Sequence, residues 1–135
     1  MSKSNATGHD VLAAILSGID PSWRSSATMF VALHTANPGV AGIATTNEVA
    51  YGGYTRVTLT KATAWVDSGA TFTNATNIVF PLCTSGSAVI THFSLVSTVS
   101  GTGQIFYSGA LSASLSVVVN IQPQFIAGAL SLSEA

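Results

Sequence analysis

The stretch THFSLVSTVSGTGQIFYSG, residues 91–109, predicts a β-hairpin and with it the fold class of the chain. Thr91, Phe93 and Leu95 alternate with the residues between them, which is the period of two expected for a strand with two different faces. The segment SGTG at 100–103 supplies a turn, and the run QIFYSG follows it. Two antiparallel strands joined by a turn are therefore expected here.

The same pattern extends outward from the hairpin in both directions. From Met29 onward, short β-branched and aromatic runs are separated by clusters of Gly, Pro, Asn and Ser. The expected strands are Thr28–His34, Tyr54–Lys61, Ala70–Thr73, Ile78–Phe80, Ala88–Ser97, Gln104–Ser108, Ser116–Ile121 and Ala129–Leu132. We therefore predict an all-β domain over residues 28–135, in which two antiparallel sheets pack face to face as a β-sandwich.

Residues 1–27 are predicted to form an N-terminal helix and arm. The apolar positions of residues 9–19 fall on one side of a short amphipathic helix: Val11, Leu12, Ile15, Leu16 and Ile19. Thr7 is the expected N-cap, and Gly18 lies where a helix would end. Trp23 follows the helix and either packs back onto the body or reaches outward to a partner.

The strands are flat, rich in Val, Thr and Ser, and poor in charge. Such strands present open sheet edges that can pair with another chain. We expect at least one edge to be covered, either by the N-terminal helix or by a second copy of the chain.

The composition argues against several classes of partner. Only 7% of the 135 residues are charged, and the formal net charge is −1. A nucleic-acid-binding surface needs clustered basic side chains, whereas the four Lys and Arg residues are scattered, so no nucleic acid partner is expected. No apolar run approaches the length of a membrane helix, and the polar N-terminus lacks the apolar core of a signal peptide, so we expect no membrane association and a cytoplasmic origin.

A nearly neutral surface rich in Ser and Thr is suited to a protein held inside an assembly, because net charge is what keeps free proteins apart. The lone Cys83 has no second thiol with which to form a disulfide or a zinc site. It is interpreted as a buried packing residue.

His34 is the residue that most resembles a catalytic group, because it leaves a strand and runs into the turn ANPG at 36–39. A general base also needs a nucleophile and an orienting carboxylate, and only Glu48 lies near it in sequence. The chain has no nucleophile elbow, P-loop or zinc-protease motif, and its three histidines are too scattered to argue for a metal site. We therefore expect no enzyme activity, catalytic residue, cofactor or metal, and interpret His34 as structural.

The candidate protein interface consists of Trp23, Tyr51, Tyr54 and Arg56. The last three lie where a long loop re-enters a strand, and Tyr and Arg are enriched where protein surfaces bury one another. The alternative is that they pack over the end of their own sandwich, with Arg56 paired to Glu48.

Five runs occur in unbroken order over roughly residues 28–133: VALHTANPG, TTNEVAYGGYTRV, THFSLVS, GQIFYSGALS and QFIAGALSLS. Together they resemble a family of small virion proteins of tailed bacteriophages, whose members are described as tail-fibre proteins or as capsid cement (decoration) proteins. The resemblance implies a jelly-roll-like sandwich that binds other virion subunits without catalytic residues. The N-terminal helix lies outside it.

Two functions follow from this resemblance. In the first, the chain is a capsid cement protein on the outer capsid surface, where a homodimer bridges major capsid proteins and stabilises the shell. In the alternative, it is a tail-fibre or other tail structural protein with receptor or glycan contact. The aromatic platforms for a sugar would then be Trp23, Trp65, Tyr51 and Tyr54.

Overall fold

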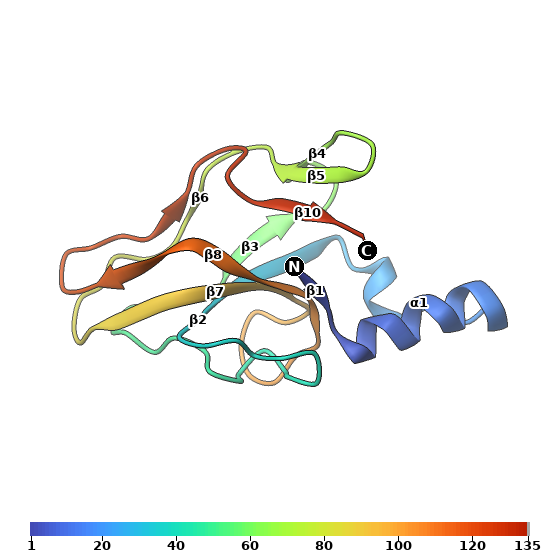
Figure 1. The fold of residues 1–135 in the computed structure, drawn as a ribbon, viewed down its shortest axis with the longest axis horizontal. Helices are drawn as coiled ribbons and strands as arrows, with labels where there is room; N and C mark the ends of the chain where they lie inside the picture. The colour runs from blue at the N-terminus through green and yellow to red at the C-terminus, as the bar shows by residue number, and fades with distance from the viewer. Residues whose placement is uncertain (135) are drawn as a thin grey trace.

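The structure is a computed structural model that describes residues 1–134, and it confirms an all-β sandwich with a short N-terminal helix (Figure 1). The helices are α1 (Asn5–Ser17) and the single-turn 3-10 helix η1 (Ser22–Ser25). The strands are β1 (Ser2–Lys3), β2 (Thr28–His34), β3 (Val57–Thr60), β4 (Trp65–Asp67), β5 (Thr71–Asn74), β6 (Ile78–Val79), β7 (Ala88–Val96), β8 (Ile105–Val117), β9 (Gln124–Phe125) and β10 (Ser131–Ser133).

The large sheet has the order β1-β8-β7-β2-β3, and all of its neighbouring strands are antiparallel. Its centre is the predicted hairpin of β7 and β8, in which Val96 pairs with Ile105 and Leu95 pairs with Tyr107. Strand β2 then pairs with β7 on the other side, for example Leu33 with Phe93. The hairpin prediction is confirmed, and it accounts for the middle of the sheet.

Strand β8 differs from the prediction, because it runs continuously where two strands, Gln104–Ser108 and Ser116–Ile121, were expected. Ile90 pairs with Leu115 and His92 with Ala110, so residues 111–114 form a bulge on β8 opposite a single residue of β7. The segment between the two predicted strands is rich in Ser and Ala, which have little strand propensity. Pairing with the long strand β7 on both sides of the bulge, at Ala110 and Leu115, keeps the strand continuous.

A second layer is formed by the small sheet β10-β5-β4 and by the separate pair β6-β9. Strands β1, β4 and β9 were not predicted, because runs of two or three residues show no measurable period. They exist because a partner strand pairs with them. Pairing also sets the ends of predicted strands. The predicted strand Tyr54–Lys61 is only Val57–Thr60, and the strand predicted at Ala129–Leu132 lies at Ser131–Ser133.

The core lies between these layers and contains aromatic side chains at its centre. Phe80 is fully buried, stacks on Tyr54 with ring centroids 6.4 Å apart and meets Phe125 edge-on at 6.1 Å. Cys83 is also fully buried, which confirms its predicted packing role. The core therefore joins the large sheet to the β6-β9 pair.

Asn74, at the end of β5, ties three segments together and is almost completely buried. Its amide nitrogen donates to the carbonyl oxygens of Thr76 at 2.8 Å and Ile126 at 2.9 Å. Its side-chain oxygen accepts from the backbone N–H of Leu130 at 2.9 Å. All of its side-chain bonds therefore serve the connection between β5 and the segment that leads to β10.

Replacing Asn74 by Asp is expected to lower the free energy of unfolding by about 3 kcal/mol, because a buried carboxylate would face two carbonyl oxygens. Asn77→Asp is the matched control. The exposed Asn77 only accepts, from the N–H of Ala127, and a carboxylate accepts equally well. Chemical denaturation of both variants tests this, and equal losses would contradict it.

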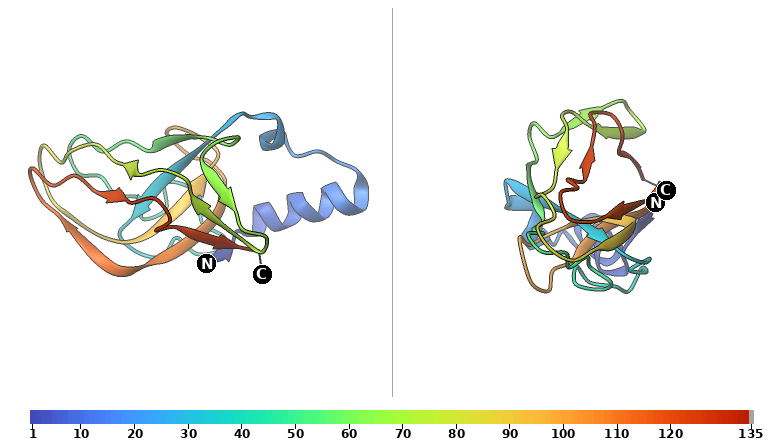
Figure 2. Two further views of the ribbon diagram at one scale, coloured as in Figure 1. Left: turned by 90° about the horizontal axis from the view of Figure 1, so that it is seen from above. Right: turned by 90° about the vertical axis from the view of Figure 1, so that its left-hand side faces the viewer.

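The N-terminal segment is attached to the sandwich through β1, which pairs with β8, and α1 then projects away from the sandwich (Figure 2). Strand β1 covers the outer edge of β8 at Tyr107 and Ser108, so the expected cover is provided by the two residues of β1 and not by the helix itself. The N-cap is Ser4 instead of Thr7, since Ser4 Oγ accepts from the Thr7 N–H at 3.1 Å. Gly18, with φ of 66°, ends the helix as predicted.

Candidate functional site

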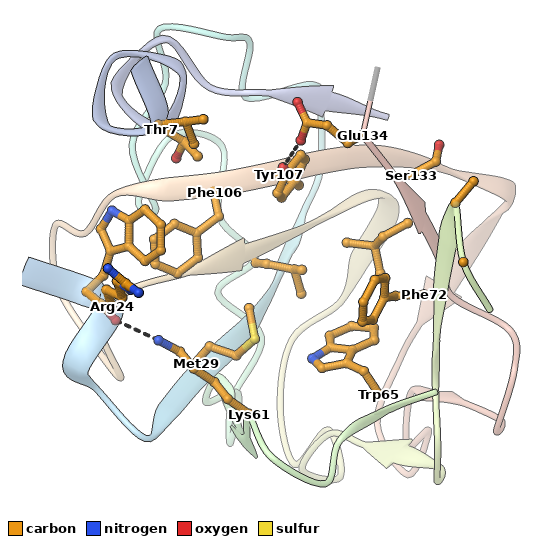
Figure 3. A pocket seen from close by; sticks show the side chains of 16 residues that line it. Thr7, Arg24, Met29, Lys61, Trp65, Phe72, Phe106, Tyr107, Ser133 and Glu134 are labelled. Carbon is orange, nitrogen blue, oxygen red and sulfur yellow. Dashed lines mark hydrogen bonds between the residues drawn. The ribbon is translucent and has the colours of Figure 1, made fainter. Parts of the chain in front are cut away.

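A groove with a volume of about 680 Å³ opens beside the base of α1, lined by side chains from both main sheets (Figure 3). We call it the aromatic groove and define it by Trp23, Trp65, Phe72, Phe106 and Tyr107. Strands β4 and β5 supply Trp65 and Phe72, whereas β8 supplies Phe106 and Tyr107. Its size is within the range of ligand-binding pockets, and most of its lining is apolar.

Trp23 forms one wall of the aromatic groove, so it packs back onto the body. Its ring meets Phe106 edge-on, with centroids 5.3 Å apart, and its Nε1–H donates to Asp10 Oδ2 at 2.8 Å. The Lys61 ammonium donates to the Trp23 carbonyl oxygen at 2.6 Å and lies 5.9 Å from the ring centroid. The indole is thus held from three sides and presents its remaining surface to the groove.

The charged groups at the rim of the groove already have partners within the chain. Glu134 accepts from both Lys3 and Tyr107, and Arg24 pairs with Asp20. Burial, together with the neighbouring Glu134, raises the pKa of Tyr107 to about 12, so this phenol stays neutral near pH 7. The groove therefore offers a partner mainly apolar contact.

The apolar side of α1 is the second unusual surface, because it faces away from the sandwich. We call Leu12, Ile15 and Leu16, together with Ile19 just beyond the end of the helix, the α1 stripe, and their exposed fractions are 58%, 72%, 77% and 61%. Fully burying such a side chain is worth about 1.5–3 kcal/mol, so the isolated chain forgoes a large hydrophobic contribution here. A group of exposed Leu and Ile side chains of this kind is typical of surfaces that contact another molecule.

Polar contacts at the base of α1 keep the stripe turned outward. Thr7 Oγ1 donates to the Ile105 carbonyl at 3.1 Å, and Asp10 accepts from Trp23 and from Gln104 at 2.9 Å. The side of the helix that bears Thr7 and Asp10 therefore faces the body. These bonds to the Asp10 carboxylate also lower its pKa, so it is ionised near neutral pH.

The other predicted interface residues lie inside their own domain. Arg56 forms a bidentate pair with Glu48, with Nε–Oε2 at 2.7 Å and Nη2–Oε1 at 2.8 Å, and it also donates to the carbonyl oxygens of Thr98 and Gly101. The exposed fractions of the two paired side chains are 2% for Arg56 and 15% for Glu48. This is the packing alternative considered from the sequence.

Tyr54 completes this cluster, since its hydroxyl donates to Glu48 Oε2 at 2.9 Å and accepts from the Leu33 N–H at 3.2 Å. Burial raises the pKa of Tyr54 strongly. Tyr54 is partly buried, whereas Tyr51 is buried, and the Tyr51 hydroxyl donates to the Pro81 carbonyl at 2.7 Å. Of the four aromatic platforms named for a sugar, Trp23 and Trp65 line the aromatic groove, whereas Tyr51 and Tyr54 do not.

His34 is fully buried and its ring nitrogens are both engaged within the fold. Nδ1 lies 2.8 Å from the Thr46 carbonyl oxygen, which can only accept, so Nδ1 carries the proton. Nε2, 2.6 Å from Ser94 Oγ, then accepts from that hydroxyl. Burial lowers the pKa of His34 below its usual value, which keeps the ring neutral. In this geometry His34 links β2, β7 and the loop after β2.

The depressed pKa of His34 predicts that stability falls with acid. The unfolded chain takes up a proton at this residue below about pH 6.5, where the folded chain resists it, so the stabilisation is complete above about pH 6.5 and is lost as pH falls through the folded pKa. The slope reaches at most about 1.4 kcal/mol per pH unit. Denaturation from about pH 7.5 to about pH 5.5 measures it. His34→Gln should flatten the slope, and a slope unchanged by this substitution would contradict the assignment.

Comparison with protein families matches residues 2–133 to the family described as Podophage GP4 fiber I protein gp80. The chain belongs to this family. The match covers nearly all of the sequence and includes the N-terminal helix, which the sequence resemblance over 28–133 left out. A comparison with curated proteins found no match.

The Podophage GP4 fiber I family identifies the chain as a bacteriophage structural protein of fibre type. This confirms the virion part of the resemblance. The family description names a fibre and no capsid component, so it agrees better with the tail-fibre alternative than with capsid cement. Within residues 1–134, no helix is long and apolar enough to span a membrane, and no three His, Cys, Asp or Glu side chains are grouped to hold a metal ion.

Sequence reasoning on this fibre-family member missed most of the aromatic groove. Phe72, Phe106 and Tyr107 look like ordinary strand residues, and only the three-dimensional separation of the two sheets places them around an unfilled space. The α1 stripe was visible as an apolar helix side. Its outward direction was not, because it depends on the bonds of Thr7 and Asp10 to distant residues.

Proposed function

We propose that the chain is a non-catalytic structural subunit of a podophage tail fibre, which acts by binding other virion proteins. The observation that carries the proposal is the family match over residues 2–133. It is supported by the uncovered α1 stripe and aromatic groove, which are two apolar surfaces available to neighbouring subunits.

The internal chemistry of the chain also favours a structural role. His34, the strongest catalytic candidate, is fully buried, and both ring nitrogens are hydrogen-bonded to groups of the fold. Arg56 and Glu48 likewise use their charges on each other and on backbone carbonyls. Polar side chains whose hydrogen bonds are all made within the fold are not available to bind a substrate.

Capsid cement is the second candidate, with the major capsid protein as partner and a homodimer as the bridging unit. The observation that favours it is a sandwich surface with few charges and many exposed apolar residues, among them Val66, Val89, Val99 and Val118. Such a surface suits repeated weak contacts, whose sum over a closed shell is large.

Immunogold labelling of intact particles with antibodies against the chain distinguishes the two. A tail-fibre subunit gives labels at the tail, whereas cement gives labels distributed over the shell. Particles that carry no label after mild disruption, together with absence of the chain from purified virions, would contradict both proposals.

A further inference from the structure

We propose that the α1 stripe of one copy of the chain seats in the aromatic groove of a second copy. Each surface is uncovered within one chain, and one contact between two copies buries both. The inference depends on these two surfaces and not on the place of the chain in the virion.

The spacing of the stripe fits a groove-binding helix. Leu12, Ile15 and Leu16 stand at positions i, i+3 and i+4 of α1, which is the start of the pattern by which amphipathic helices anchor in apolar grooves, and Ile19 follows just beyond the Gly18 C-cap. Leu12 to Leu16 span about 6 Å along the helix axis. The groove, at about 680 Å³, has room for several such side chains.

A chain cannot fill its own groove with its own stripe. The base of α1 already lines the groove through Thr7 and Val11, and the helix leads away from that point (Figure 2). Bending it back would break the bonds that Thr7 and Asp10 make to the body. Any cover for the stripe therefore has to come from another molecule.

The charges of the chain favour a second copy as that molecule. The stripe has no charged residue, and Arg24, Lys61 and Glu134 at the groove rim are already bonded within the chain. Seating the stripe thus leaves no charge buried without a partner, so two neutral apolar surfaces complement each other. Val11 lines the groove and lies one helical turn before Ile15, so the stripe and the groove form a continuous surface. Two copies can therefore each seat the α1 stripe in the groove of the other.

The test uses the full chain and two variants, each altered in one half of the contact. Leu16→Asp places a charge in the stripe, and Phe72→Asp places one in the groove at a side chain that is 43% exposed. Light scattering coupled to gel filtration at high micromolar concentration should show self-association of the unaltered chain. Each variant alone should have a dissociation constant at least about tenfold higher.

Mixing the two variants gives the sharpest result. A Leu16→Asp copy keeps a normal groove and a Phe72→Asp copy keeps a normal stripe. At a concentration at which each variant alone is monomeric, a two-chain species should therefore reappear in the mixture. Val99→Asp, at an apolar side chain that is 55% exposed and outside both surfaces, should associate like the unaltered chain. If Leu16→Asp fails to fold, Leu12→Asp replaces it.

Three results would overturn the proposal. A monomeric unaltered chain at high micromolar concentration would exclude the contact. Normal association of the Leu16→Asp variant would exclude the stripe, and loss of association with Leu16→Asp but not with Phe72→Asp would show that the stripe binds something other than the groove.

Discussion

Replacing Arg56 by Met is expected to lower the free energy of unfolding by about 3–5 kcal/mol. The substitution leaves the Glu48 carboxylate, which is 15% exposed, without its bidentate partner. The carbonyl oxygens of Thr98 and Gly101 also lose the donor that Arg56 provides. Breaking one side of a buried ion pair costs far more than the pair itself contributes, because the remaining charge is poorly solvated. Urea denaturation at a fixed protein concentration measures the loss.

Arg24→Met is the matched control for Arg56→Met. Arg24 also pairs with a carboxylate, that of Asp20, but the exposed fractions of the two side chains are 68% and 71%. Solvent screens such a pair, so its removal should leave the unfolding free energy nearly unchanged. Similar losses of unfolding free energy for the two variants would mean that the contacts of Arg56 with Glu48, Thr98 and Gly101 do not stabilise the fold as their geometry indicates.

Phe80→Ala is the second substitution with a large expected effect, also about 3–5 kcal/mol. Phe80 lies at the centre of the core between Tyr54 and Phe125. Truncating it leaves a cavity where its ring packed between the large sheet and the β6-β9 pair. The aromatic neighbours cannot collapse into that space without breaking the Tyr54 bonds to Glu48 and Leu33.

Leu82→Ala provides the comparison for Phe80→Ala in the same segment of the chain. Leu82 is 42% exposed, so its truncation removes fewer contacts and should cost less than about 1 kcal/mol. Thermal or chemical unfolding of both variants separates core packing from general sensitivity of this segment. A loss at Leu82 as large as that at Phe80 would contradict the placement of the core.

The sequence predicted those parts of the fold in which a repeating pattern runs over several residues. The alternation around Phe93 and Leu95 identified the central hairpin, and the apolar positions of residues 9–19 identified the helix. Strands β1, β4 and β9 were invisible because they are too short to show a period. The bulge in β8 was invisible because it results from the register with β7 and leaves no local signal.

The predictions for the candidate site came from two sources, the composition and individual residues. The low charge indicated contact with other proteins, and the family match supports a structural fibre-type protein. Tyr51, Tyr54 and Arg56 were singled out because large amphipathic side chains are frequent at interfaces, yet the same properties suit them to cap the end of a sandwich, where the structure places them. Only burial distinguishes these two roles, and burial depends on the whole fold.

The central claim is that this chain is assembled into the virion through apolar surfaces that the isolated chain leaves uncovered. A density map of the intact phage particle tests it most directly. The account predicts density for the chain in the tail fibre, with Leu16 and its neighbours on α1 in contact with protein. Finished particles without the chain, or a fibre in which the α1 stripe faces solvent, would contradict it.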